Sequence, residues 1–195
     1  MIKGMFSVYH NENIIDEEIK DFIKSWHYSK SSRSQQQKHV FKLVDTSDRL
    51  VGVAIYGNPM SKSYNGSKTI ELRRLCLIDD TPKNTESWFI SRTLKWLNKN
   101  TDYTSVVSFA DPNKGHQGTI YKASNFSYDG LEDNNNPRVV QYGTKTIHLR
   151  QFYQKKDGEY SDDALRLQAL VKSGSASIIK QERKHRFIYS FANKE

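Results

Sequence analysis

Cysteine and long apolar runs are scarce in this sequence. Cys76 is the one cysteine among 195 residues, so no disulfide can form within the chain, as is typical of proteins from a reducing cytosol. The apolar run at 50–57, LVGVAIYG, is far too short to span a membrane. Residues 1–20 lack the apolar segment and small-residue cleavage site of a secretory signal peptide. We therefore expect a cytoplasmic protein with no membrane partner.

Acidic residues are fewer than basic ones. There are 22 Asp and Glu against 30 Lys and Arg, which gives a formal net charge of +8 and a pI near 9.4. Such a balance favours a polyanionic partner, because neutralising phosphates releases their counterions. The basic residues gather in 29–39 and 180–186. Nucleic acid is the natural candidate, although charge runs are also common on surfaces that contact only solvent.

The pattern of apolar residues predicts alternating strands and helices. The spacing of Ile15, Ile19, Phe22 and Trp26 predicts an amphipathic helix with Asn13 as its N-cap. The expected strands are 5–10, 38–45, 49–57, 69–78, 104–110, 143–152 and 185–192, and the expected helices are 13–26, 85–100, 116–124 and 161–172. This order predicts a mixed α/β fold in a single domain over residues 1–195, with a mixed central sheet flanked by helices.

Polar residues follow the apolar strand 104–110. Asp111 opens a loop that contains Pro112 and Gly115, and a helix is expected next. Open α/β sheets build ligand sites where a strand ends in this way, so Asp111 is a candidate hydrogen-bond acceptor in a site. The alternative is that Asp111 opens an Asp-Pro turn or caps a helix. Cys76, within the strand-like run 70–78, is expected to be buried and inert.

Two segments resemble GNAT acyltransferases. The segment 119–130, TIYKASNFSYDG, places Tyr121 where a GNAT tyrosine usually acts as a general acid toward the leaving group, with Asn125 in place of the usual glycine. The segment 71–97 lies where GNATs bind the donor pyrophosphate, a task that suits a helix N-terminus. The usual Gly-x-Gly/Ala loop is replaced there, and the donor-binding candidates are Arg73, Lys83, Asn84, Thr85 and Ser87.

Four separated segments in the same order resemble the Mom family, phage proteins that hypermodify adenine in their own DNA. They are WHYSKS at 26–31, the run 71–91, the run 109–130 and KHRFIYSF at 184–191. The resemblance implies transfer of a carbamoylmethyl group to adenine N6 in double-stranded DNA, in the infected host cell, which protects phage DNA from restriction. It points to six site residues: His27, Tyr28, Arg73, Ser87, Asp111 and Tyr121.

That reaction gives each residue type a role. Asp111 could accept the proton of N6 or hold N6 by a hydrogen bond, and Tyr121 could return a proton to the leaving group. The base has to flip out of the duplex, where it could stack on His27 and Tyr28. The flanking phosphates would be held by Lys30, Arg33, Lys38, Lys184 and Arg186.

Simpler interpretations stay open for several of these residues. The pair His27 and Tyr28 could be a helix C-cap with a packed aromatic ring. Arg73 could be an exposed partner of acids, and Ser87 could merely start a helix. His27 and Asp111 could supply two ligands to an iron ion, although no local spacing of metal ligands supports a metal site.

The donor and the reaction class each leave alternatives. The donor could be glycyl-tRNA, which would bring tRNA as a second partner, or acetyl-CoA with further chemistry. A GNAT N-acetyltransferase that acts on a small amine or a protein is the first rival function. An adenine-N6 methyltransferase is disfavoured, because Asn113 stands where the second proline of its signature belongs and no Gly-x-Gly occurs in the chain. A non-catalytic nucleic-acid-binding module would not need Asp111 or Tyr121.

Overall fold

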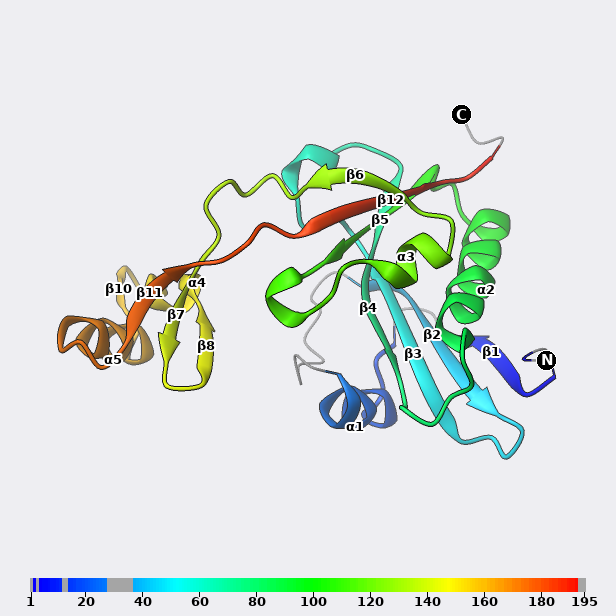
Figure 1. Cartoon of the computed structure of the whole chain (residues 1–195), viewed down its shortest axis with the longest axis horizontal. Helices are drawn as coiled ribbons and strands as arrows, with labels where there is room; N and C mark the ends of the chain where they lie inside the picture. The colour runs from blue at the N-terminus through cyan, green and yellow to red at the C-terminus, as the bar shows by residue number, and fades with distance from the viewer. Residues whose placement is uncertain (1, 3, 12–13, 28–36, 193–195) are drawn as a thin grey trace. The chain divides into compact units, whose positions relative to one another are not determined.

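The computed structural model describes residues 2, 4–11, 14–27 and 37–192. The chain forms two compact units (Figure 1). Unit 1 comprises Met1–Ala110, Gln117–Gly130 and His185–Glu195, and unit 2 comprises Asp111–His116 and Leu131–Lys184. The expectation of a single domain over residues 1–195 stays a prediction. In the described part of the chain, no helix is both long enough and apolar enough to cross a membrane.

A seven-stranded mixed sheet forms the centre of unit 1 (Figure 1). Its strand order is β1-β2-β3-β4-β5-β12-β6. The pair β4 and β5 is parallel, whereas β1 with β2, β2 with β3, β3 with β4, and β12 with β5 are antiparallel. This sheet confirms the predicted mixed α/β class. The strands are β1 (Phe6–His10), β2 (Gln37–Asp45), β3 (Leu50–Gly57), β4 (Thr69–Leu77), β5 (Ser105–Ala110), β6 (Ser127–Leu131) and β12 (His185–Ser190).

The helices of unit 1 follow the amphipathic pattern closely. Helix α2 (Thr85–Asn100) has the predicted bounds, and it buries Phe89, Ile90, Leu94 and Leu97 against the sheet. The remaining helical segments of this unit are α1 (Glu17–Trp26), η1 (Lys62–Tyr64) and α3 (Thr119–Ala123).

The N-cap of α1 is Asp16, so the prediction of Asn13 was wrong. The Asp16 carboxylate accepts a hydrogen bond from the Ile19 N–H at 2.9 Å. It also pairs with the Lys42 ammonium on β2 at 2.8 Å. Asp16 is the better N-cap because its carboxylate interacts with both the helix N-terminus and Lys42, whereas the side chain of Asn13 is an uncharged amide three residues earlier in the sequence.

Aromatic rings fill the space between α2 and the sheet. The His10 ring lies 3.8 Å from the Trp96 ring by centroids, and His10 Nε2 lies 3.1 Å from His39 Nδ1. Burial, and then the neighbouring His10 and Lys38, lower the pKa of His39 from 6.5 to about 4. The ring of His39 is therefore neutral at physiological pH, and it packs near the Trp96 ring at a centroid distance of 5.4 Å.

Unit 2 has a core of its own around Val140, Leu167 and Ala176. Its three-stranded sheet has the order β11-β7-β8. The predicted strand 143–152 was wrong in its second half, because His148 Nδ1 accepts the Arg150 N–H and caps a short helix there. The elements of the unit are η2 (Pro112–Lys114), β7 (Arg138–Tyr142), β8 (Lys145–His148), α4 (Leu149–Phe152), β9 (Lys155–Lys156), β10 (Glu159–Tyr160), α5 (Asp162–Lys172) and β11 (Ser177–Lys180).

Candidate active site

Strands β4 and β5 part in the middle of the sheet. They pair only where Thr69, Ile70 and Glu71 lie beside Ser105, Val106 and Val107. Beyond these residues β4 continues to Leu77 and β5 to Ala110 without further pairing between the two strands in the described part of the chain. The Ser108 hydroxyl, which is buried, donates to the Leu72 carbonyl at 3.0 Å and closes the base of this parting. Backbone groups of a central strand are thereby left to interact with a ligand.

A β-bulge lies on β4 at the parting. Ile55 pairs with Arg74 and Tyr56 pairs with Leu72, so Arg73 is the extra residue. A bulge redirects the side chain of its extra residue. Arg73 Nη2 lies 3.0 Å from Met60 Sδ, and its buried Nη1 has no hydrogen-bond partner within the described residues. A buried guanidinium nitrogen without a partner suits a bound anion or carbonyl oxygen. This favours a binding role for Arg73 over the simpler interpretation, in which Arg73 pairs with an acidic side chain.

Glu71 is a further candidate at this parting that was not selected from the sequence. It is the last residue of β4 that pairs with β5, and only 8% of its surface is exposed. One carboxylate oxygen accepts the Met60 N–H at 2.8 Å. The signal in the sequence was an acid inside the strand TIELRRLCL, a position where carboxylates are rare unless they are paired.

Tyr121 lies near this parting. Its ring contacts the rings of Phe126 and Phe187 at centroid distances of 5.6 and 5.4 Å. Tyr56, whose backbone pairs with Leu72 at the bulge, has a pKa raised mainly by burial and further by the nearby Tyr121. The Tyr56 hydroxyl bonds to Thr93 Oγ1 at 2.6 Å, which anchors this side of the site to α2.

Asp111 follows β5 directly and caps the turn η2. Its Oδ1 accepts from the Asn113 N–H at 3.0 Å and from Asn113 Nδ2 at 2.9 Å. The turn-forming role that competed with the catalytic one is thus present in the structure. Asp111 belongs to unit 2 and Tyr121 to unit 1, and their proton-transfer roles at one site stay a prediction.

The start of α2 fits an anionic group. Asn84 precedes the helix with a φ of 70° in the left-handed region, and its side chain makes no capping hydrogen bond. Asparagine is among the few non-glycine residues that adopt this conformation readily, which explains how the helix can start here without the expected glycines. The hydroxyls of Thr85 and Ser87 donate back to the carbonyls of Pro82 and Asn84. The first turn therefore has no side-chain cap from Asn84 to compete with a phosphate.

Other predicted site residues have structural roles or lie outside the described residues. His27 is 7% exposed and ends α1, with its N–H donating to the Ile23 carbonyl at 3.0 Å, as the C-cap alternative expected. Tyr28, Lys30 and Arg33 lie outside the described residues.

The remaining predicted DNA contacts are divided between the two units. Lys38 is exposed on β2, in unit 1. The Arg186 side chain, also in unit 1, pairs with the Asp129 carboxylate at 2.8 Å. Lys184 belongs to unit 2, where its N–H donates to Glu132 Oε1 at 3.0 Å.

The sequence model of the Mom protein family matches residues 9–195. The chain belongs to the Mom family. The methylcarbamoylase Mom of Escherichia phage Mu is 30% identical to it in an alignment of length 180, which covers 87% of this chain and 66% of that protein. The chain thus spans just under two thirds of the length of this relative. The resemblance found in the sequence is confirmed.

Solved structures confirm the GNAT fold of this Mom family chain. A ribosomal-protein-S5-alanine acetyltransferase from Vibrio fischeri aligns over 98% of this chain and 96% of its own, with a TM-score of 0.55 and 10% identity. A Bacillus subtilis acetyltransferase in complex with CoA aligns over 95% and 99%, also with a TM-score of 0.55 and 10% identity. A GNAT family N-acetyltransferase from Escherichia coli, in complex with CoA, aligns over 63% and 69% with a TM-score of 0.51 and 13% identity.

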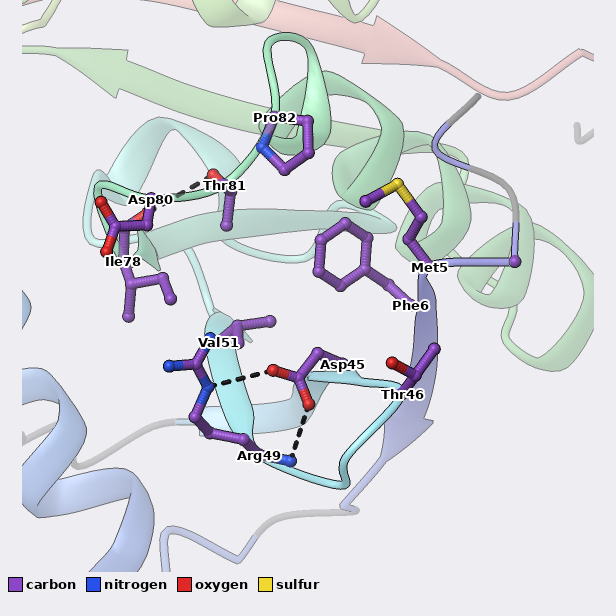
Figure 2. A pocket seen from close by; sticks show the side chains of 11 residues that line it. Met5, Phe6, Asp45, Thr46, Arg49, Val51, Ile78, Asp80, Thr81 and Pro82 are labelled. Carbon is purple, nitrogen blue, oxygen red and sulfur yellow. Dashed lines mark hydrogen bonds and ion pairs between the residues drawn. The ribbon is translucent and has the colours of Figure 1, made fainter.

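A pocket of about 320 Å³ lies beside the loop that precedes α2 in this Mom family chain (Figure 2). Phe6, Val51 and Ile78 contribute apolar surface, and Asp45 forms an ion pair with Arg49 at 3.0 Å. Of the predicted donor-binding residues that the structure describes, none lines it. Ile78, Asp80, Thr81 and Pro82, which also line the pocket, lie in the loop between β4 and α2.

Metal and thiol chemistry find little support in the residues that the structure describes. Among them no group of three or more His, Cys, Asp and Glu could hold a metal ion. His27 and Asp111, the two predicted iron ligands, fall in different units, and their role in metal binding stays a prediction. Cys76 is buried, which raises the pKa of its thiol to about 12 and agrees with the expected inert role.

Proposed function

We propose that this chain is a transferase that adds a carbamoylmethyl group to adenine N6 in double-stranded DNA, in the cytoplasm of the infected host cell, and so protects the DNA from restriction. Membership of the Mom family and the methylcarbamoylase of phage Mu support DNA modification. The GNAT fold supports group transfer. The observation that carries the proposal is the parting of β4 and β5, with the Arg73 bulge beside it. The Tyr121 ring contacts Phe187, whose backbone pairs with Ser108 at this parting.

Proton transfer explains why a tyrosine and a carboxylate are needed. The lone pair of adenine N6 is delocalised into the ring, so the amine is a weak nucleophile and benefits from a proton acceptor. We assign that role to Asp111 and the return of a proton to the leaving group to Tyr121. The flipped base would stack on His27 and Tyr28, and Lys30, Arg33, Lys38, Lys184 and Arg186 would hold phosphates.

The start of α2 is our candidate for the donor site. Its first turn carries no side-chain cap from Asn84, and Lys83 lies beside it, so a phosphate of either coenzyme A or a tRNA end suits it. The guanidinium of Arg73 could hold the carbonyl oxygen of the acyl group. These residues bind and orient a donor, and the donor supplies the activated acyl group.

A glycyl donor needs only acyl transfer by the enzyme. Glycine joined through its carbonyl to N6 is an isomer of the carbamoylmethyl product. Its free amine can attack C6 through a five-membered ring, after which the bond from C6 to the original nitrogen breaks and leaves a terminal amide. Feeding cells with isotopically labelled glycine or acetate separates the donors. Modified adenine that is labelled by glycine alone supports glycyl-tRNA as the donor. Modified adenine that is labelled by acetate alone supports acetyl-CoA and contradicts the glycyl route.

Restriction digestion of plasmid DNA tests the assigned tyrosine. DNA from cells that express the wild-type chain should resist endonucleases whose sites contain adenine. Tyr121→Phe should lose roughly 100-fold to 10,000-fold of the modification rate, which is the usual contribution of a general acid. Tyr128→Phe is the matched control, because Tyr128 is an exposed tyrosine on β6, of which 54% is accessible. Equal protection by the two variants would remove Tyr121 from the mechanism.

Asp111 requires a variant that keeps its turn. Asp111→Asn retains a side-chain oxygen that can accept the Asn113 N–H, but it cannot take up a proton at neutral pH. We expect an unchanged melting temperature and loss of DNA protection. Full protection by this variant would show that Asp111 serves only the turn.

A GNAT N-acetyltransferase that acts on a small amine or a protein is the second candidate. The GNAT neighbours that were solved in complex with CoA favour it. It predicts consumption of acetyl-CoA with such an amine and no change in DNA. Modified adenine in DNA would contradict it.

A further inference from the structure

The strands of unit 2 bring basic residues to one end of its three-stranded sheet. Strand β7 begins where β8 and β11 end, because both are antiparallel to it. Arg138 is paired directly with Lys180 of β11, and the next residue, Val139, is paired with His148 of β8. Lys180, Arg138 and His148 therefore lie on three successive strands at the same end of the sheet.

Two more basic groups lie close to this end. Burial lowers the pKa of His148, and the positive charges of Arg150 and Lys184 lower it further. Arg150 lies beside the ring, since its N–H donates to His148 Nδ1 at 3.0 Å, and Lys184 lies four residues after Lys180. We call these residues the basic end of unit 2: Arg138, His148, Arg150, Lys180 and Lys184.

Within the described residues, no acid neutralises the exposed cations of the basic end. Every ion pair found among those residues lies in unit 1. Arg138, Arg150 and Lys180 are exposed, and none has a carboxylate within 4.0 Å in the described part of the chain. Glu132 approaches this region, but its carboxylate accepts the backbone N–H of Lys184 and its carbonyl accepts the Arg183 side chain.

Direct pairing of Arg138 with Lys180 costs stability in the free protein. Like charges on directly opposite residues of neighbouring strands destabilise a sheet. An anion between them converts the repulsion into two charge-assisted contacts. Adjacent strands lie about 4.8 Å apart, so the outer strands β11 and β8 are about 10 Å apart. Lys180 is on β11, and Arg150 lies two residues beyond the end of β8. The separation of about 10 Å between the outer strands corresponds to about three nucleotides at about 3.4 Å per step along one DNA strand.

We propose that the basic end of unit 2 binds the phosphate backbone of double-stranded DNA. The proposal rests on the proposed function, in which duplex DNA is the substrate. It adds contacts to the duplex to the catalytic role that the proposed function gives to Asp111 of unit 2. Contacts of this kind fix the position of a protein on DNA without reading its sequence.

The test is the salt dependence of binding to a mixed-sequence duplex, followed by fluorescence anisotropy. The test variant is Arg138→Gln/Arg150→Gln/Lys180→Gln. The control is Lys20→Gln/Lys24→Gln/Arg49→Gln, which removes three cations that are exposed but already paired with acids. Each variant removes three positive charges from a chain of net charge +8. Loss of three phosphate contacts lowers the slope of log K against log salt by about 2.7, whereas the control should leave the slope close to wild type.

The outcomes separate this proposal from the proposed function. If the test and control variants have equal slopes and the wild-type chain binds duplex DNA, the proposed role of the basic end is contradicted. The proposed DNA modification is not affected by that result. A wild-type chain that does not bind duplex DNA would overturn both. Loss of tRNA binding with retention of duplex binding would assign the basic end to RNA instead. Arg138→Lys/Arg150→Lys/Lys180→Arg keeps every charge, so it should keep the wild-type slope and show that charge, not folding, carries the effect.

Discussion

Substitution of Gly118 should disturb both the stability of unit 1 and the position of Tyr121. Gly118 has a φ of 75°, and a Cβ placed on it would overlap the ring of Phe187. Phe187 is only 1% exposed, so its ring has no open space into which it can move. Gly118→Ala thus combines a left-handed backbone cost of about 1–2 kcal/mol with an overpacking cost of about 1–3 kcal/mol.

Gly66→Ala isolates the steric part of this effect. Gly66 has a φ of 76°, but a Cβ added to it would meet nothing within 4 Å. For a chain of this size each kcal/mol lowers the melting temperature by about 2–4 °C, so Gly118→Ala should melt about 2–12 °C below Gly66→Ala. Thermal unfolding followed by circular dichroism measures the difference. Equal melting temperatures would refute the assigned contact, and partial recovery in Gly118→Ala/Phe187→Leu would support it.

Three further results are expected. His39 has a pKa of about 4 in the folded chain against 6.5 ordinarily, so its contribution to stability is complete above pH 6.5 and is lost as the pH falls toward 4. Over this pH range the urea midpoint of His39→Gln should fall less steeply than that of the wild-type chain. Equal pH profiles of the two midpoints would contradict the lowered pKa of His39. Cys76 should resist iodoacetamide at pH 8 until urea unfolds the chain, and rapid alkylation of the folded protein would show that its thiol is accessible. Tyr56→Phe should cost about 0.5–1.5 kcal/mol in denaturant unfolding, because Thr93 keeps its bond to the Ile90 carbonyl. A larger loss of unfolding free energy would mean that removing the Tyr56 hydroxyl disturbs more of the core than the Tyr56–Thr93 hydrogen bond alone.

The sequence predicted best those elements that bury one clear face. Helix α2 has the predicted bounds because Ile90, Leu94 and Leu97 recur at helical spacing. Strands β2 and β3 were found because their apolar runs flank a polar turn. Strands β6, β7 and β11 were missed, since β6 and β11 are largely exposed and their residues alternate weakly. Their pairing is decided by distant partners that a local pattern does not contain.

The candidate site was predictable in its residues more than in its geometry. Asp111 and Tyr121 were selected from the sequence, but the parting of β4 and β5 depends on pairing between strands far apart in the chain. The Arg73 bulge depends on the register against Ile55 and Tyr56, which no local spacing encodes. Glu71 could not be selected from the sequence, because its burial depends on the pairing of β4 with β5 and not on a local pattern.

The measurement that tests the central claim most directly is mass spectrometry of nucleosides from plasmid DNA of cells that express this chain. The proposed function predicts a deoxyadenosine heavier by one carbamoylmethyl group, which is absent with empty vector and with Tyr121→Phe. A different added group on deoxyadenosine would keep DNA as the substrate and contradict the proposed donor chemistry. Unmodified DNA from cells in which the chain is soluble and folded would contradict the proposed function itself.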